Sequence, residues 1–332
     1  YDPAGRSTTI LDAKNQQTTT TFDKVGRLVT LQYSDSTRVT MQYDGIGQRT
    51  TMIDSGGTTT YAWDDRGSMT RKSLPGGYVL QMGYDAVGNR TTLVDPDSGV
   101  FTSTFDALNR VATVKDPDGN LTTLAYDADS RLTTQTDANG VTSLFQYDSA
   151  SRLTTSIDFN ASSVRIMTMV DSYDAVANRL TRNLDGNLTT WTYDDAGRMT
   201  GQDNSGGRGT YIYDANWNMT TKHEQGSNPM TFSHDAANRL TTMLEGTALA
   251  TYTFDNNGNM TAEFGSDGGD IFLQVNYGYD PANRLVTMIN NLGMARSTYT
   301  FDGLGLRRST QNLGGSLTTF IWDGTDYLME KN

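Results

Sequence analysis

Residues 126–147 read YDADSRLTTQTDANGVTSLFQY. Two runs that alternate polar and apolar side chains, 131–136 and 141–147, flank the connector DANG at 137–140. Alternation of Thr, Leu, Val and aromatic residues around a short Asp, Asn and Gly segment is typical of a β-hairpin. An aromatic residue followed by Asp stands at both ends, as Tyr126-Asp127 and Tyr147-Asp148. The stretch therefore predicts a hairpin that repeats.

The same aromatic slot recurs along the whole chain. It is found sixteen times at spacings of 20–26 residues, at Tyr1, Phe22, Tyr43, Trp63, Tyr84, Phe105, Tyr126, Tyr147, Tyr173, Tyr193, Tyr213, His234, Phe254, Tyr279, Phe301 and Trp322. A chain of 332 residues would ordinarily be divided into two domains. A single period over its full length instead predicts one repeat array covering 1–332.

Each slot aromatic is followed by Asp, and three residues later by Gly or a small polar residue, with Ala177 and Trp217 as departures. Gly accepts a positive φ without strain, and Asp can bond to its own backbone two residues on. We predict a turn with a left-handed residue, best marked by Asp2 and Gly5, Asp23 and Gly26, Asp44 and Gly47, Asp85 and Gly88, Asp194 and Gly197, and Asp255 and Gly258. Arg follows in twelve repeats, and we expect it to bond to the Asp of its own or a neighbouring repeat.

The residue two before the slot is apolar except at Thr20, Ser103 and Asp171. A period of two places both positions on one face, which predicts a ladder of buried aromatic side chains. Sixteen hairpins give about 32 strands, and a twisted sheet of more than about ten strands curls. We therefore expect an all-β fold, with one continuous coiled antiparallel sheet that forms part of a hollow spiral shell. Two long repeats predict loops or widened hairpins near 158–165 and 265–270.

Composition excludes several functions. Asp and Glu number 38 against 26 Lys and Arg, so the net charge of −12 disfavours nucleic acids and anionic membranes as partners. There is no Cys and there are two His, so thiolate catalysis and Cys-ligated zinc are excluded. His234 occupies an aromatic slot, and His223 lies on a polar strand. We predict no cofactor, no metal site and no membrane-spanning segment.

Carboxylate pairs such as Asp95 with Asp97 or Asp194 with Asp195 offer acid–base or glycosidic chemistry in principle. Such groups recur with the repeat, so we interpret them as turn residues that face solvent with ordinary pKa values. The Asp-Pro-Asp segment at 95–97 lacks the closing Glu of a calcium loop. Four Asn-x-Thr sequences, beginning at Asn120, Asn187, Asn218 and Asn259, arise from the repeat itself. The sequence predicts a protein that is not an enzyme.

The pattern YDxxGRLT, followed by a DxxG turn and a return to the next aromatic-Asp pair, resembles the YD repeats of the Rhs family, which toxin-complex B and C subunits and teneurins share. The resemblance covers the whole chain. It implies a hollow β-shell, which encapsulates a C-terminal toxin in bacterial members and supports adhesion in animal members. The self-cleaving segment of bacterial members would follow the last repeats, so we expect no self-cleavage and interpret the chain as a piece of a longer protein.

Three functional hypotheses follow. The first is a shell segment of a secreted or cell-surface bacterial protein that encloses a cargo or toxin domain of the same polypeptide. The second is an extracellular filament or tube that grows when the sheet edges of copies pair. The third is an adhesin whose aromatic side chains bind glycans or a protein partner.

Overall fold

The computed structural model describes residues 1–292 and 295–332 and has an all-β fold. Its 31 described strands belong to one sheet, and the only helical element among these residues is a 3₁₀ turn at Pro75–Gly77. Within the described chain, no helix has the length and apolar character needed to cross a membrane. The predicted all-β hairpin fold is confirmed.

The chain forms two compact units. One contains Tyr1–Gln81 together with Leu240–Asn332, and the other contains Met82–Arg239. Strand β8, at Val79–Tyr84, includes the first boundary.

The first unit holds β1 (Thr9–Leu11), β2 (Gln17–Phe22), β3 (Leu28–Gln32), β4 (Arg38–Tyr43), β5 (Arg49–Asp54), β6 (Gly57–Trp63), β7 (Met69–Ser73), β23 (Leu240–Glu245), β24 (Ala248–Phe254), β25 (Met260–Asp267), β26 (Asp270–Tyr279), β27 (Leu285–Asn290), β28 (Ala295–Phe301), β29 (Arg307–Asn312), β30 (Leu317–Asp323) and β31 (Asp326–Lys331).

The second unit holds β9 (Arg90–Val94), β10 (Val100–Phe105), β11 (Val111–Lys115), β12 (Leu121–Tyr126), β13 (Leu132–Thr136), β14 (Thr142–Tyr147), β15 (Leu153–Phe159), β16 (Arg165–Tyr173), β17 (Arg179–Leu184), β18 (Asn187–Tyr193), β19 (Met199–Asn204), β20 (Gly207–Tyr213), β21 (Met219–Glu224) and β22 (Met230–His234).

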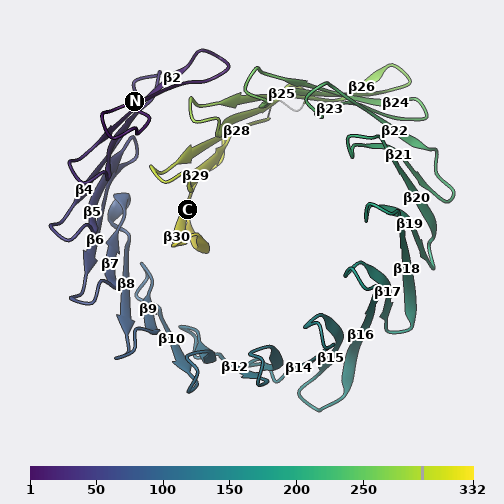
Figure 1. Ribbon diagram of the computed structural model, residues 1–332, viewed down its shortest axis with the longest axis horizontal. Helices are drawn as coiled ribbons and strands as arrows, with labels where there is room; N and C mark the ends of the chain where they lie inside the picture. The colour runs from purple at the N-terminus through teal and green to yellow at the C-terminus, as the bar shows by residue number, and fades with distance from the viewer. Residues whose placement is uncertain (293–294) are drawn as a thin grey trace. The chain divides into compact units, whose positions relative to one another are not determined.

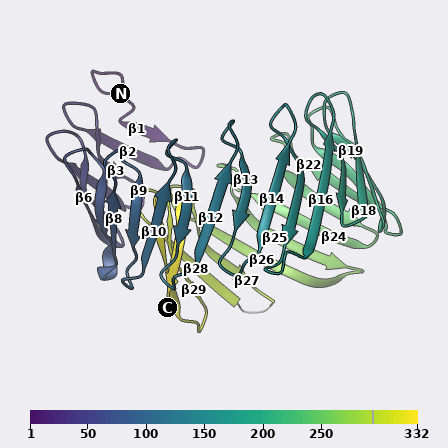
Figure 2. The same ribbon diagram turned by 90° about the horizontal axis from the view of Figure 1, so that it is seen from below.

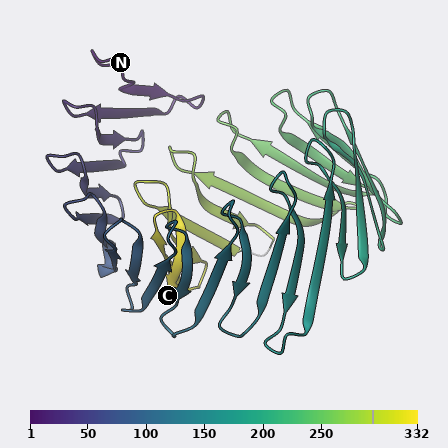
Figure 3. The same ribbon diagram turned by 60° about the horizontal axis from the view of Figure 1, so that its bottom comes forward.

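Within each unit, strands that follow one another in sequence pair in antiparallel fashion. Figure 2 shows strands β11 to β16 of the second unit side by side, with turns at two edges. Figure 3 shows the same order in the green strands after residue 240. A bulge before the slot aromatic recurs in the register of many described strand pairs: Ala125 pairs with Thr134, but Tyr126 pairs with Leu132. The bulge leaves an extra residue on one strand where the turn begins.

The two long repeats are widened hairpins, which was one of the two predicted alternatives. Strands β15 and β16 extend to Phe159 and from Arg165, and strands β25 and β26 extend to Asp267 and from Asp270. The additional residues therefore lengthen paired strands and leave only short turns between them.

The first unit has a buried apolar cluster on β4, β5 and β6. Val39, Met41, Met52 and Tyr61 form a cluster in which each side chain is at most 8% exposed. Met41 and Met52 are direct cross-strand partners, so they share one sheet face. Burial of such side chains supplies the hydrophobic stabilisation of this unit.

Late residues of the chain pack on the same cluster, and both segments can be followed in Figure 1, in purple to blue and in yellow. A Cβ on Gly303 would lie 2.7 Å from Val39 Cγ1 and 3.0 Å from the Met52 sulfur, so this approach requires glycine. The Gly303 amide donates to Asp54 Oδ2 at 2.7 Å. Arg308 donates to both Asp54 oxygens at 2.8 and 2.9 Å.

Candidate functional site

The Asp of the slot pair builds its own turn. In the repeat at Tyr126, Asp127 Oδ1 accepts hydrogen bonds from the amides of Asp129 and Arg131, both at 2.9 Å. The Ser130 amide donates to the Asp127 carbonyl at 3.1 Å. The same two carboxylate bonds are made by Asp2, Asp23, Asp44, Asp64, Asp85, Asp106, Asp148, Asp174, Asp194, Asp214, Asp235, Asp255, Asp280 and Asp302.

The residue three after the Asp has a left-handed backbone. This is so at Gly5, Gly26, Gly47, Gly88, Gly197 and Gly258, whose φ values lie between 76° and 100°. Ala177 and Trp217, which depart from the sequence pattern, adopt the same conformation with φ of 72° and 71°. The turn geometry therefore overrides residue preference at these two positions. In the last repeat, the position three residues after the slot Asp is Asp326, which begins strand β31. The left-handed residue of this repeat is Gly324 instead.

Replacing Ala177 by glycine is expected to stabilise the protein by about 1 kcal/mol, because an L-residue in this conformation carries a steric cost that glycine lacks. Urea unfolding measures the change. The control is Ala150→Gly, at a turn position outside the positive-φ region, where glycine should destabilise by about 0.5–1 kcal/mol. Equal effects of the two substitutions would contradict the account of the turn.

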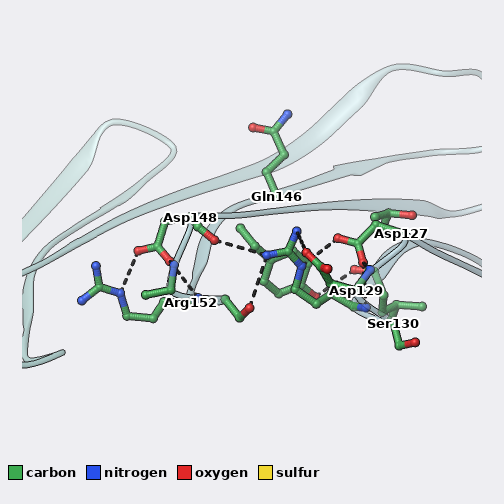
Figure 4. A network of polar contacts seen from close by, with 12 residues as sticks. Asp127, Asp129, Ser130, Gln146, Asp148 and Arg152 are labelled. Carbon is green, nitrogen blue, oxygen red and sulfur yellow. Dashed lines mark hydrogen bonds and ion pairs between the residues drawn. The ribbon is translucent and has the colours of Figure 1, made fainter.

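Arg131 joins its own repeat to the next one, and Figure 4 labels the two Asp residues to which it bonds, Asp127 and Asp148. Its Nε donates to Asp127 Oδ2 at 2.7 Å, and its Nη1 donates to the Asp148 carbonyl at 3.2 Å. Its guanidinium carbon lies 5.2 Å from the centroid of the Tyr147 ring, within cation–π range. We call this arrangement the clamp: an Arg held by its own Asp that contacts the carbonyl and the aromatic ring of the following repeat.

The clamp recurs in both units. The Arg-to-carbonyl bonds of 2.7–3.1 Å are Arg27 to Asp44, Arg110 to Asp127, Arg152 to Asp174, Arg198 to Asp214 and Arg284 to Asp302. The same five guanidinium carbons lie 4.6–5.1 Å from the next aromatic ring. Repeats are thus coupled to their nearest neighbours.

Asn replaces the clamp Arg in several repeats, which sequence reasoning missed. Asn178 Nδ2 donates to Asp174 Oδ2 at 2.9 Å, and Asn218 does the same to Asp214. Asn89 and Asn259 make the same bond to Asp85 and Asp255. The signal was present in the sequence, because Asn takes the place of Arg immediately after the left-handed residue.

The slot aromatics also hold the preceding repeat. Tyr126 Oη donates to the Val111 carbonyl at 2.9 Å, and Tyr147 Oη donates to the Leu132 carbonyl at 2.8 Å. Trp63 makes the equivalent bond through Nε1 to the Arg49 carbonyl. The slot rings are half-buried, apart from exposed Tyr1. Ring–ring contacts join Tyr327 to Phe320 and Trp322. Guanidinium groups of Arg side chains therefore contact the faces of many slot rings.

Several of the turn carboxylates have pKa values below the ordinary range. The side-chain hydrogen bond from the clamp Arg is the largest cause that lowers the pKa of Asp106 and Asp235. The backbone amide of the clamp Arg is the largest cause for Asp127, Asp148 and Asp194. The expectation of ordinary pKa values is therefore wrong for these five carboxylates, because their turns gather hydrogen-bond donors around one oxygen pair.

The lowered pKa values predict loss of stability in acid. A carboxyl whose folded pKa lies below its unfolded value of about 3.9 stabilises the fold above that pH, and the contribution disappears as pH falls through the folded pKa. The melting temperature should therefore decrease as pH is lowered from about 5 to 2. Calorimetry checks this, and Asp106→Asn should weaken the pH dependence. A melting temperature that is constant or rises in acid would contradict it.

Not every carboxylate belongs to a solvent-facing turn, which corrects a second expectation. Asp171, on β16, is 4% exposed and ion-paired with Arg179 and Arg182. Asp95 is 7% exposed, and its Oδ1 accepts the amides of Asp97 and Gly99 at 2.8 Å each. Asp95 is thus a turn former that is also buried.

Groups suited to metal binding are dispersed in the described residues, where no three Asp, Glu or His side chains gather as a metal site requires. His234 lies at the end of β22 in its aromatic slot, and His223 lies on β21. Asn120, Asn218 and Asn259 use their amide groups to bond to turn carboxylates, and Asn187 donates to the Leu184 carbonyl.

The chain is similar to known proteins in sequence and in fold. The sequence model of the teneurin YD-shell family matches residues 1–177 and 175–327. Curated proteins provide no match. Among solved structures, the crystal structure of TcdB2-TccC3 has a TM-score of 0.64 at 13% identity, over 96% of this chain and 21% of the other.

Two further structures are similar. The TcdB2-TccC3-Cdc42 crystal structure has a TM-score of 0.63 at 13% identity, over 93% of this chain and 20% of the other. The Photorhabdus luminescens Tc holotoxin pore has a TM-score of 0.62 at 13% identity, over 93% and 19% of the two chains. The chain spans about one fifth of the solved chains it matches. At this identity the likeness establishes the fold alone.

Proposed function

Because this chain belongs to the teneurin YD-shell family, we propose that it is a non-enzymatic wall segment of a hollow shell in a secreted or cell-surface bacterial protein. The shell encloses another part of the same polypeptide, a cargo or toxin domain. The single array over 1–332 then serves as wall along its whole length.

The observation that carries this proposal is the clamp. Hydrogen bonds and cation–π contacts tie each clamped repeat to the next, as at Arg110 with Tyr126 and Arg131 with Tyr147. Such nearest-neighbour coupling builds a continuous sheet and commits the charged side chains to structural bonds. An enzyme would instead need a nucleophile or acid–base pair set apart from the repeat.

Limited proteolysis of the protein encoded by the complete reading frame tests the proposal. The segments outside residues 1–332 should resist trypsin in the intact protein and become sensitive when the wall is opened by Tyr126→Ala. Equally rapid cleavage in the intact protein would contradict enclosure. The matched control is an exposed substitution on the same strand as Tyr126, Leu121→Ala.

Self-assembly through sheet edges is a second candidate function. It is favoured by β1, a three-residue strand whose Ile10 and Leu11 are 55% and 61% exposed. Edge strands with exposed apolar side chains pair with other chains. Sedimentation velocity over a range of concentrations tests this, and replacement of Ile10 by lysine should abolish any association.

A further inference from the structure

We call the sheet face that carries the slot aromatics the ladder face. One repeat of the second unit places a charged residue on this face where its flanking repeats have an apolar one. The residue paired directly with the slot aromatic is apolar in the flanking repeats, where Tyr147 pairs with Leu153 and Tyr193 with Met199. At Tyr173 the partner is Arg179. Asn178 performs the local turn bond to Asp174, so Arg179 is free of the clamp.

Arg179 lies beside a buried carboxylate. The Asp171 side chain is 1% exposed, and Arg182 donates to its two oxygens at 2.8 and 2.7 Å. Arg179 Nε is 3.0 Å from Asp171 Oδ2. Burial acts to raise the pKa of Asp171, but the hydrogen bonds of Arg182 and the positive charges of Arg179 and Arg182 outweigh it and lower the pKa. The carboxylate is therefore ionised and already engaged by Arg182.

This arrangement leaves positive charge and donors unused. Two guanidinium groups face one carboxylate, and the Arg179 side chain is 37% exposed. Its terminal nitrogens have no hydrogen-bond acceptor within the described part of the chain. Its guanidinium carbon lies 5.9 Å from the Tyr173 ring and 5.8 Å from the Trp191 ring, so aromatic groups border it.

The first unit shows what covers a ladder face. There Met41 and Tyr61 are 7% and 8% exposed, and Gly303 approaches Val39 and Met52 of the same cluster. Gly303 also bonds to Asp54, which forms an ion pair with Arg308. In the second unit two of the corresponding positions, Phe145 and Trp191, are only half-buried. Elsewhere in the same chain, a polypeptide segment that includes an ion pair thus packs on this face.

We infer that Arg179, with Tyr173 and Trp191, forms a binding site for a carboxylate side chain of an extended polypeptide whose apolar residues lie on the neighbouring ladder positions. The inference rests on the proposed function, which supplies an enclosed polypeptide. A guanidinium fork favours a carboxylate over a neutral amide, because the hydrogen bonds become charge-assisted. In a chain of net charge −12, such a site fixes the position of an acidic segment that other surfaces repel.

Two pentapeptides test the site on the full chain. One is acetyl-Leu-Phe-Asp-Leu-Gly-amide, and the other carries Asn in place of Asp. Calorimetry at low salt should show about tenfold tighter binding of the acidic peptide, a preference that added salt reduces. Binding of the acidic peptide should change the tryptophan fluorescence of the Trp217→Phe variant, in which Trp191 is the remaining indole of the second unit.

Variants separate the site from general adhesion of peptides. Arg179→Leu introduces leucine, the residue type that pairs with Tyr147 in the flanking repeat. Asp171 keeps its ion pair with Arg182, so the fold should persist. It should remove the preference for the acidic peptide. Arg165→Leu, an exposed change on β16, the strand that pairs with the strand of Arg179, should leave the preference intact.

Equal binding of both peptides, or a preference that survives Arg179→Leu, would overturn the carboxylate site while leaving the enclosing wall untouched. Failure of both peptides to bind would overturn the site as well. The proposed function is judged separately, by the proteolysis of the complete protein, so the two failures are distinguishable.

Discussion

Replacing Arg308 by methionine is expected to lower the free energy of unfolding by about 3–5 kcal/mol, the largest single effect on the first unit. Arg308 and Asp54 are 16% and 4% exposed at the side chain, and Arg308 donates to both Asp54 oxygens. The substitution leaves a buried, charged carboxylate whose remaining donors are the backbone amides of Gly56 and Gly303. Urea unfolding measures the change.

The control for this substitution is the double variant Asp54→Asn with Arg308→Met. Asparagine keeps an acceptor for the Gly303 amide and removes the isolated charge, so the double variant should recover about 2 kcal/mol of the loss. A single substitution that costs less than about 1 kcal/mol, as an exposed pair would, contradicts the description of this junction.

Replacing Tyr126 by alanine is expected to cost about 3 kcal/mol, in the lower part of the range for aromatic deletions because the ring is half-buried. The change removes the ring beneath Arg110 and the hydrogen bond to the Val111 carbonyl. In a repeat array the damage should spread about one repeat each way. Hydrogen exchange should therefore accelerate around Phe105 and Tyr147.

The conservative control is Tyr126→Phe, which keeps the ring and loses only the hydroxyl bond, and should cost about 1 kcal/mol. Unchanged exchange at both flanking slots after Tyr126→Ala would show that the ring is not a structural rung. That result would favour the alternative in which the aromatic side chains bind glycans.

The hairpin array was predictable because it depends on local chemistry. An alternation of two, an Asp that caps its own turn and a left-handed residue are all visible in a stretch such as 126–147. The same logic could not assign the left-handed conformation at Ala177 and Trp217, since neither residue type favours it. There the identical turns on both sides impose the backbone.

The sequence pattern could not predict contacts between residues that are far apart in the chain. Asp54 reads as an ordinary connector residue, and only the fold brings Arg308 to it. Likewise Asp171 appeared as an exception to an apolar slot, and its cross-strand pairing with Arg182 explains the charge. The clamp was anticipated in outline, but its second acceptor is a backbone carbonyl of the next repeat, which side-chain patterns do not reveal.

The most direct test of the clamp as the link between repeats is a double-mutant cycle on Arg110 and Tyr126. Arg110 lies 4.6 Å from the Tyr126 ring of the following repeat, so Arg110→Met and Tyr126→Leu should show a coupling energy of about 1 kcal/mol. Arg110→Met with Phe105→Leu, the aromatic of its own repeat, should be nearly additive. Zero coupling with Tyr126, or equal coupling with both aromatics, would contradict the account.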